Sequence, residues 1–327
     1  MIILVGDIGG THSRIAYCAF EAGQAECDVE EIYPSIEYSS LDAIVRKFVG
    51  NYGKRTKRAC FAVPGPVRDR RVQTTNLPWT VDASLLQQEL GLKTVTLIND
   101  LEAIAFGIDV LKPEDLALVS EGDRDAKGNA AVIAAGTGLG EAGLYWDGTR
   151  RVPFACEGGH TDFAPTDDLQ YGLFRYLSAR FGHVCWERVV SGPGLCSIYN
   201  FLRDGGHGNE PDWLRLEMEQ GDPASQISRH GLDGTNALCV QALDLLVSLY
   251  GREAGNLALK IMATGGVFLG GGIAPKILAK LRGPGFLKAF SSKGRMSELL
   301  KAIPVRVILN DKAGLLGAAA HCAALRA

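Results

Sequence analysis

The feature that most restricts the fold of this 327-residue chain is a pattern that occurs twice, an apolar strand, a turn of glycine and threonine, and a second strand. The first copy runs from Ile2 to Phe20 around Gly9-Gly10-Thr11, and the second runs from Ala131 to Trp146 around residues 136–140. Glycine permits the positive φ angles that tight turns need, so each copy predicts a β-hairpin. One copy near the start and one in the middle predict two related lobes rather than a tandem array.

The rest of the chain alternates apolar strands with stretches of helical periodicity. Strands are expected at 59–63, 94–98, 267–269 and 305–309. Helices are expected at 41–49, 85–90, 101–108, 191–200, 239–262 and 313–325, and another is expected to start at Ala274-Pro275. Residues 205–234 are rich in Gly, Asp, Ser and His, so a surface excursion between helices is expected there. The alternation of strands and helices predicts an α/β fold.

The charge of the chain argues against a nucleic-acid partner. The formal net charge is -3, and lysine and arginine are scattered among aspartate and glutamate. No basic stripe is therefore present to neutralise a phosphate backbone. The hydrophobic share of 46% is ordinary for a globular protein, and the length is sufficient for two lobes with separate cores.

Cysteine spacing and the two termini indicate the cellular compartment. The eight cysteines include no C-x-x-C pair and no histidine at zinc spacing, so buried free thiols are expected. The N-terminus has no basic stretch, and Asp7 interrupts its first apolar run, so no signal peptide is predicted. The Ala-rich C-terminus contains His321 and Arg326 and is too short to span a bilayer. A cytoplasmic protein with no membrane partner is expected.

The two glycine turns are candidate phosphate-binding sites. Asp7 precedes Gly9, Gly10 and Thr11, so backbone N–H groups that can approach an anion lie beside a carboxylate that can hold Mg²⁺. A plain hairpin turn is the alternative interpretation. The second turn contains the dinucleotide-binding pattern G-x-G-x-x-G at 138–143. That motif requires a helix to begin at the glycines, whereas a strand continues here, so a second phosphate-binding hairpin is predicted.

Asn99 and Asp100 lie where a buried strand gives way to a helix. In open α/β sheets ligands gather beyond the carboxyl ends of strands, which makes Asp100 a candidate functional carboxylate. Asp and Asn are also favoured helix N-caps, so the local sequence favours a capping role over a catalytic one, and the two roles can coexist.

Glu157-Gly158-Gly159-His160 places an acid and an imidazole around two glycines. Together with Asn99 and Asp100 these side chains form the mixture of charged and amide groups that binds the hydroxyls of a sugar. His160 by itself is equally typical of a surface or a satisfied core histidine. Glu187 by itself is indistinguishable from a solvated helix residue.

Motifs along nearly the whole chain resemble the bacterial-type glucokinase family, hexokinase relatives within the actin-like ATPase superfamily. They are DIGGTHSR at 7–14, PGPV at 64–67, LINDLEAIAFGI at 97–108, AGTGLG at 135–140, EGGHTDFAP at 157–165, ERVVSGPGL at 187–195, GGVFLGGGIAP at 265–275 and LLGAAAH at 315–321. The resemblance implies a two-lobed actin-like (duplicated ribonuclease H-like) ATPase fold. A small α/β domain of residues 1–110 plus 306–327, a large α/β domain of residues 111–305 and an active site in the cleft between them are expected.

The same resemblance implies ATP-dependent phosphorylation of glucose at its 6-hydroxyl, with Asp100 as the catalytic base. The implied glucose ligands are Asn99, Asp100, Glu157, His160 and Glu187. The implied ATP-binding residues are Gly9, Gly10 and Thr11 in the first hairpin, Gly136, Thr137 and Gly138 in the second, and Gly271 near the adenosine. Asp7 corresponds to the carboxylate near Mg²⁺. A homodimer is also implied.

Two positions depart from related sequences. Many relatives carry Asn at the position of His12, which leaves the nucleotide contact there open. The zinc motif of the related repressor–kinase group is absent, since TDFAP follows His160, so no structural zinc is expected.

Alternative functions remain at this level. One is a kinase for another hexose or with a polyphosphate donor, and another is a nicotinamide oxidoreductase. A sugar-responsive regulator of the same fold would need a helix-turn-helix before the first strand, which begins here at Ile2.

Overall fold

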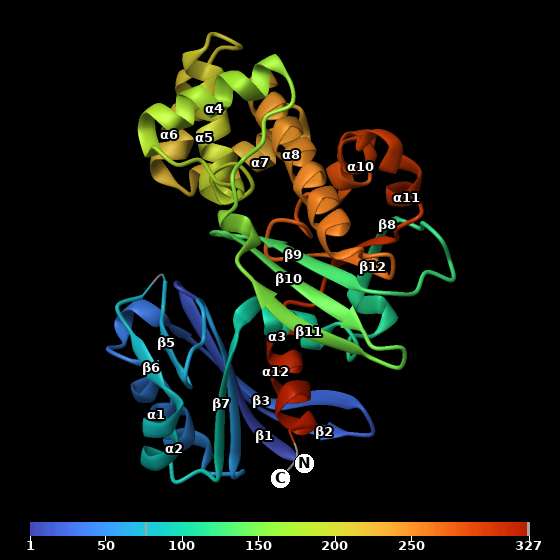
Figure 1. The fold of residues 1–327 in the computed structure, drawn as a ribbon. Helices are drawn as coiled ribbons and strands as arrows, with labels where there is room; N and C mark the ends of the chain where they lie inside the picture. Colours follow the sequence, from blue (N-terminus) through green and yellow to red (C-terminus); the bar gives the residue numbers. More distant parts are fainter. Residues whose placement is uncertain (76, 326–327) are drawn as a thin grey trace. The chain divides into compact units, whose positions relative to one another are not determined.

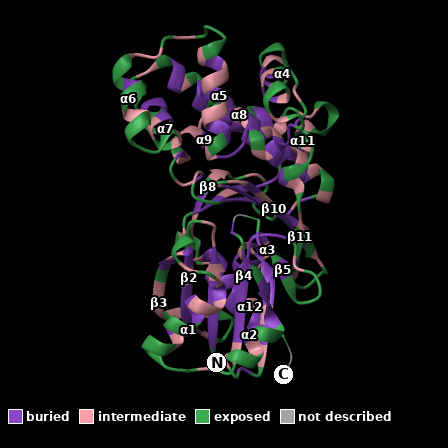
Figure 2. Cartoon of the chain, turned by 90° about the vertical axis from the view of Figure 1, so that its left-hand side faces the viewer, coloured by how far each residue is buried: buried purple, intermediate pink, exposed green. Residues whose placement is uncertain are grey.

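The computed structural model describes residues 1–75 and 77–325, which form two compact units. The first unit contains Met1–Asp115, Arg151–Ala155 and Asn310–Ala327, and the second contains Leu116–Arg150 and Cys156–Leu309. Figure 2 shows that buried residues concentrate in the sheets and along the helix faces that pack on them. Among the described residues, no helix is long and apolar enough to cross a membrane.

The first unit is built on a five-stranded sheet with the order β3-β2-β1-β4-β7 (Figure 1). The strands are β1 (Ile2–Ile8), β2 (His12–Glu21), β3 (Gln24–Pro34), β4 (Arg58–Val63) and β7 (Thr94–Asn99). β1 is antiparallel to β2, whereas β1, β4 and β7 run parallel to one another. The carboxyl ends of these three strands therefore meet at one edge of the sheet.

Helices cover both faces of this sheet because its central strand is apolar on both sides. Along β1, Leu4 packs into the cluster that contains α1 and α2, while Ile3 packs with α3 and α12. This two-residue period sends successive side chains to opposite faces. The helices are α1 (Leu41–Tyr52), α2 (Ala83–Glu89), α3 (Asp100–Gly107) and α12 (Ala313–Ala324), and a small two-stranded sheet is formed by β5 (Arg71–Gln73) and β6 (Thr80–Asp82).

The second unit contains β10, β9, β12, β13 and β8 of a six-stranded sheet with the order β11-β10-β9-β12-β13-β8, whose edge strand β11 belongs to the first unit except for Cys156. Its strands are β8 (Leu116–Ser120), β9 (Ala130–Ala135), β10 (Leu139–Trp146), β11 (Arg151–Cys156), β12 (Gly266–Gly270) and β13 (Val305–Ile308). Its helices are α4 (Asp168–Phe181), α5 (Gly192–Asp204), α6 (Asp212–Gln220), α7 (Pro223–Asp233), α8 (Ala237–Ile261), α9 (Leu278–Leu281), α10 (Pro284–Ser291) and α11 (Ser297–Lys301). Short 3₁₀ turns occur at 35–37, 113–115, 158–160, 186–188 and 294–296.

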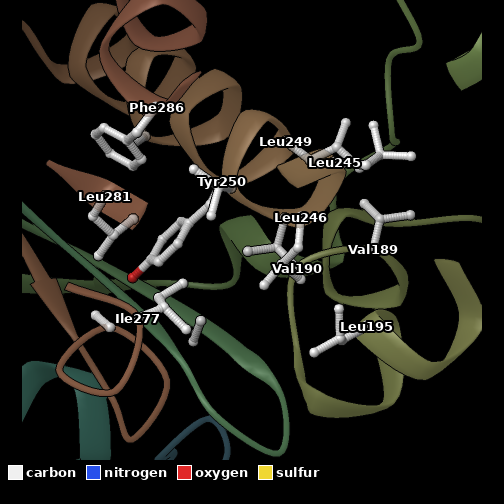
Figure 3. Close-up of a cluster of buried hydrophobic side chains, with 14 of the residues drawn as sticks. Val189, Val190, Leu195, Leu245, Leu246, Leu249, Tyr250, Ile277, Leu281 and Phe286 are labelled. Atoms are coloured by element: carbon white, nitrogen blue, oxygen red, sulfur yellow. The ribbon is translucent and has the colours of Figure 1, made fainter. Parts of the chain in front are cut away.

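The long helix α8 forms the centre of the second unit's core (Figure 3). Tyr250 points from α8 toward the sheet, and its hydroxyl donates a hydrogen bond of 3.0 Å to the carbonyl oxygen of Ile133. The ring packs edge-on against Phe286 at 5.9 Å between centroids. A buried tyrosine hydroxyl needs such a partner, so the contact fixes how α8 rests on the sheet.

Both predicted hairpins are confirmed, since β1 pairs antiparallel with β2 and β9 with β10. The predicted long helix is confirmed as α8, and the predicted closing helix as α12. No helix begins at the glycines of 138–143, where β10 continues, so the structure agrees with the rejection of a dinucleotide motif.

Residues 205–234 are largely exposed, as a surface excursion would be, but they contain two helices that were not expected, α6 and α7. The polar composition hid both helix starts, and the start of α7 is set by a local cap. The Asp222 side chain accepts a hydrogen bond of 3.2 Å from the amide of Ser225, and Pro223 occupies the first turn of α7. Ile227 is buried against the core, so the helix gains its stability from packing rather than from composition.

Two further expectations are wrong. The helix expected to start at Ala274-Pro275 begins only at Leu278, because Gly271 has a φ of 79° and the following residues form turns. The cysteines are not all free thiols, because Cys18 and Cys27 form a disulfide. The register of β2 and β3 places these two residues directly opposite each other. A separation of nine residues along the chain does not reveal this pairing.

Candidate active site

The turn between β1 and β2 is held in shape through its carbonyl groups. The amide of Gly9 donates to the carbonyl of His12 at 2.9 Å, and Ser35 donates from its hydroxyl to the carbonyl of Gly9 at 2.8 Å and from its amide to that of Thr11 at 2.9 Å. Within the described part of the chain, no hydrogen bond uses the amides of Gly10 and Thr11. These amides are suited to bind phosphate oxygens.

Asp7 lies at the carboxyl end of β1, just before this turn. Burial raises the pKa of Asp7 to about 6, although the Arg14 guanidinium opposes the shift. Arg14 itself is paired with Asp311 at 2.8 Å. A Cβ atom at Gly314 would lie 2.9 Å from the Asp7 carboxylate, so the first turn of α12 leaves room for that group only because residue 314 is glycine. A carboxylate oxygen is the ligand type that Mg²⁺ prefers, and Asp7 therefore fits that ion.

Asn99 and Asp100 occupy the carboxyl end of β7 at the same edge. The side-chain oxygen of Asn99 caps α3 by accepting from the amides of Leu101 at 2.9 Å and Glu102 at 3.3 Å. Its amide nitrogen donates to the carbonyl of Gly65 at 3.3 Å. Asp100 is the first residue of α3 rather than its cap, and its side chain is partly exposed. Asn99 is thus the cap residue, and Asp100 shares one of its bonds, because the Asp100 carboxylate also accepts from the amide of Leu101 at 3.0 Å.

The turn between β9 and β10 borders a cavity of about 550 Å³ in the second unit. The amide of Gly136 donates to the carbonyl of Gly138 at 2.9 Å, and the carbonyl of Gly136 accepts from the amide of Gly192 at 2.9 Å. Gly136 and Thr137 line the cavity together with the first residues of α5. The second hairpin thus lies at the mouth of a space large enough for a small organic ligand.

Sequence reasoning missed several polar residues of this cavity, namely Asp222, Ser225, Ser228 and Lys276. The first three belong to the start of α7, and the Asp-Pro pair at 222–223 was the local signal for that helix N-terminus. Gly272 also lines the cavity, whereas the predicted Gly271 is not among its lining residues. Gly271 passes so close to the carbonyl of Ala135 that a Cβ atom would overlap it.

Leu139 connects the second hairpin to the other predicted sugar ligands of this unit. Its amide donates to the Glu187 carboxylate at 3.0 Å, and the same carboxylate leaves no room for a Cβ atom at Gly138. Its carbonyl lies against Gly159, where a Cβ atom would overlap it. The start of β10 therefore contacts both the segment that carries Glu187 and the turn of residues 157–160.

Glu157 and His160 flank a short 3₁₀ turn formed by residues 158–160. The Nε2 atom of His160 lies 3.9 Å from the Glu157 carboxylate, and both side chains are about half exposed, at 56% and 55%. The structure thus brings Glu157, His160 and Glu187 together in the second unit. It places Asp7, Asn99 and Asp100 at one sheet edge in the first unit.

Solved structures of glucokinases share this architecture. A glucokinase from an Antarctic psychrotroph aligns with a TM-score of 0.83 and 32% identity over 98% of each chain. The glucokinase of Balamuthia mandrillaris in complex with glucose has a TM-score of 0.79 and 20% identity, covering 98% of this chain and 93% of its own, which shows the shared fold. The fold and the two hairpins therefore define a sugar kinase of the actin-like ATPase class.

Sequence comparison identifies the family within that class. The sequence model of the glucokinase family matches residues 4–325. Curated glucokinases from a Nostoc species and a Synechocystis species are each 40% identical, the first over 99% of both chains and the second over 98% of this chain and 97% of its own. The chain belongs to the glucokinase family and phosphorylates glucose with ATP as the phosphoryl donor.

Proposed function

We propose that the phosphoryl group is transferred to the 6-hydroxyl of glucose, with Asp100 as the base that accepts the proton of that hydroxyl. The observation that carries this assignment is the position of Asp100, directly after the carboxyl end of β7 and in the first turn of α3. Asn99 caps α3 by accepting from the amides of Leu101 and Glu102, and the Asp100 carboxylate accepts a further bond from the amide of Leu101. Its place at the carboxyl end of a parallel strand is where ligands gather in open α/β sheets.

Asn99, Glu157, His160 and Glu187 are proposed to hold the sugar ring. Carboxylate, amide and imidazole groups can each bond neighbouring hydroxyls of a sugar. Leu139 contacts both Glu187 and the 157–160 turn, so one backbone segment holds both. This shared contact supports a preorganised set of sugar ligands. Such positioning dominates phosphoryl transfer, whose loose transition state gains little from covalent catalysis.

The two hairpins are proposed to bind the phosphates of ATP through backbone N–H groups. In each hairpin the carbonyl of the first glycine is occupied, by Ser35 in one and by Gly192 in the other, which orients the turn. The cavity beside Gly136 and Thr137 is suited to the nucleoside, with Gly271 shaping the backbone behind it. Mg²⁺, held by Asp7 directly or through water, would offset negative charge on the phosphates.

The proposal requires residues of both compact units to act on one glucose and one ATP. A lobe motion that excludes water would protect ATP from hydrolysis, because water is itself a possible acceptor. Resemblance to the family supports a homodimer and a cytoplasmic location. Sedimentation of the purified chain at micromolar concentration tests the dimer.

The base assignment is tested by Asp100→Asn, which keeps the size of the side chain and removes its basicity. We expect kcat for glucose 6-phosphate formation to fall about a hundredfold to ten-thousandfold in a coupled assay, because that is the usual contribution of a general base. Glu102→Gln, two residues further along α3, removes the same charge and should retain activity. Near wild-type turnover of Asp100→Asn would overturn the assignment.

A further inference from the structure

Two carboxylic acids in the interior of the second unit interact with each other, and both lie outside the set of residues assigned above. Glu141 of β10 is 1% exposed and Glu253 of α8 is 0% exposed. A buried carboxylate is costly unless it is paired or hydrogen-bonded, and two neighbouring buried carboxylates also repel each other. The buried pair is therefore stable only in a particular protonation state.

The surroundings of the two acids are unequal. Glu253 accepts a hydrogen bond of 2.7 Å from the Asn256 amide and lies 3.3 Å from the Lys260 ammonium. Both carboxyl oxygens of Glu141 are buried, and neither has a hydrogen-bond partner among the described residues when it is treated as a carboxylate. Glu253 is thus equipped to be the anion, and Glu141 to be the neutral acid that donates to it.

The electrostatics agree with this division. Burial and the neighbouring Glu253 raise the pKa of Glu141 to about 8, against a smaller opposing effect of Lys260. Lys260 is half exposed, so water weakens its influence. At neutral pH the two acids then share one proton, as like charges at close range do elsewhere in proteins.

Other ionisable groups face the pair from each neighbouring element. Cys156, at the end of β11, has its thiol pKa raised by burial and by the acids at 141 and 157. Beyond α8, the ammonium of Lys293 donates to the carbonyl of Arg252 at 3.1 Å and to the Asn256 side chain. Burial lowers the pKa of Lys293, so its charge is a weak counterweight.

Glu141 lies directly against the turn that carries the proposed sugar ligands. A Cβ atom at Gly158 would overlap the Glu141 carboxyl group. Gly158 separates Glu157 from Gly159 and His160, and Gly159 is packed on the carbonyl of Leu139, two residues before Glu141. A change in the charge or position of the Glu141 carboxyl would therefore act on this turn first.

We propose that Glu141 is a positioning residue for glucose, because its protonated carboxyl, hydrogen-bonded to Glu253, supports the turn of residues 157–160, and loss of that proton weakens glucose binding. The inference rests on the proposed sugar contacts of Glu157 and His160. It adds a pH-sensitive support to that site, built from two side chains outside the proposed set of sugar ligands.

The test is the pH dependence of KM for glucose between pH 6.5 and 9.5. In the wild type the protonated fraction of an acid with a pKa of 8 falls about tenfold between pH 7 and pH 9, so KM should rise by up to about that factor. Glu141→Gln keeps the shape and an N–H donor toward Glu253 but cannot ionise. Its KM should stay flat across the range, while KM for ATP should follow the same course in both proteins.

A second variant, Glu253→Gln, gives a directional check. It removes the negative neighbour, so the pKa of Glu141 should fall and the step in KM should move to lower pH. The exposed Glu298→Gln serves as a matched control that leaves the wild-type step in place. A step that persists unchanged in Glu141→Gln would overturn the inference.

The pH dependence of the free energy of unfolding reports on the Glu141 proton independently of enzyme activity. Because the folded pKa of Glu141 is raised, its protonation stabilises the fold fully below the unfolded pKa, near 4.5, and this contribution is lost as pH rises through about 8. Glu141→Gln should remove that loss. A stability step without a KM step would reject the link to glucose, whereas failure of the proposed sugar site would appear separately, as unchanged glucose affinity in Glu157→Gln.

Discussion

At the scale of single residues, Asn99 shows how one side chain can serve both structure and site. Its oxygen satisfies the first amides of α3, and its nitrogen holds the loop at Gly65. Both groups are used in the interior, where an unpaired polar atom is costly. The geometry of Asp100, the proposed base, therefore depends on the cap that its neighbour Asn99 provides.

Replacing Asn99 with alanine should lower the free energy of unfolding by about 1 to 2 kcal/mol, because the amide of Glu102 loses its acceptor and that of Leu101 keeps only the Asp100 carboxylate. Affinity for glucose should fall as well. Urea denaturation and KM measure the two effects.

Ser40→Ala is the matched control, because Ser40 caps α1 with a bond of 3.3 Å to the amide of Ala43. It should cost about 1 kcal/mol by the same mechanism and leave KM for glucose unchanged. Unaltered stability of Asn99→Ala would show that the cap contributes nothing.

At the scale of elements, α3 and α12 approach each other closely through glycines. A Cβ atom at Gly317 of α12 would overlap the carbonyl of Ala103 in α3, and one at Gly107 of α3 would lie on the carbonyl of Ala313. Backbone packs on backbone at both points. This approach holds α12, whose first turn also leaves room for the Asp7 carboxylate at Gly314.

Gly317→Ala should destabilise the protein by about 1 to 3 kcal/mol, the usual cost of overpacking a tight contact. Gly50→Ala in α1 is the matched control, because a Cβ atom there meets nothing within 4 Å. The control should gain about 0.5 to 1 kcal/mol from the better helix propensity of alanine. Urea denaturation followed by circular dichroism measures both, and shifts of the same sign would contradict the packing argument.

At the scale of the whole molecule, the residues assigned to one reaction are distributed over two compact units with separate cores. Asp7 and Asp100 belong to the first unit, and Glu157, His160 and Glu187 to the second. Because glucose binds the native protein and not the unfolded chain, it should stabilise the fold by mass action.

Glucose at a hundredfold excess over its Kd should raise the free energy of unfolding by about 2.7 kcal/mol. If Glu157→Gln weakens glucose binding tenfold, the same glucose concentration should add only about 1.4 kcal/mol. Stabilisation by ATP should be unchanged in this variant. Thermal denaturation with each ligand measures both, and equal loss with glucose and ATP would count against Glu157 as a sugar ligand.

Much of the fold was predictable because its signals are local. Glycine turns between apolar strands predicted both hairpins, and helical spacing predicted α8 and α12. The failures were also local in origin. The polar composition of 205–234 concealed α6 and α7, whose stability comes from burial of residues such as Ile227, and strand register rather than spacing brought Cys18 beside Cys27.

The sequence by itself determined the α/β class, the two glycine hairpins, the glucokinase family and the identity of the chemical groups in the candidate site, because these depend on residue type and short-range order. Only the tertiary structure decided that Asn99 rather than Asp100 caps α3, that Leu139 joins Glu187 to the 157–160 turn, and that Glu141 meets Glu253 in the core. These contacts join residues that are distant along the chain or compete for one role, so packing and register select them.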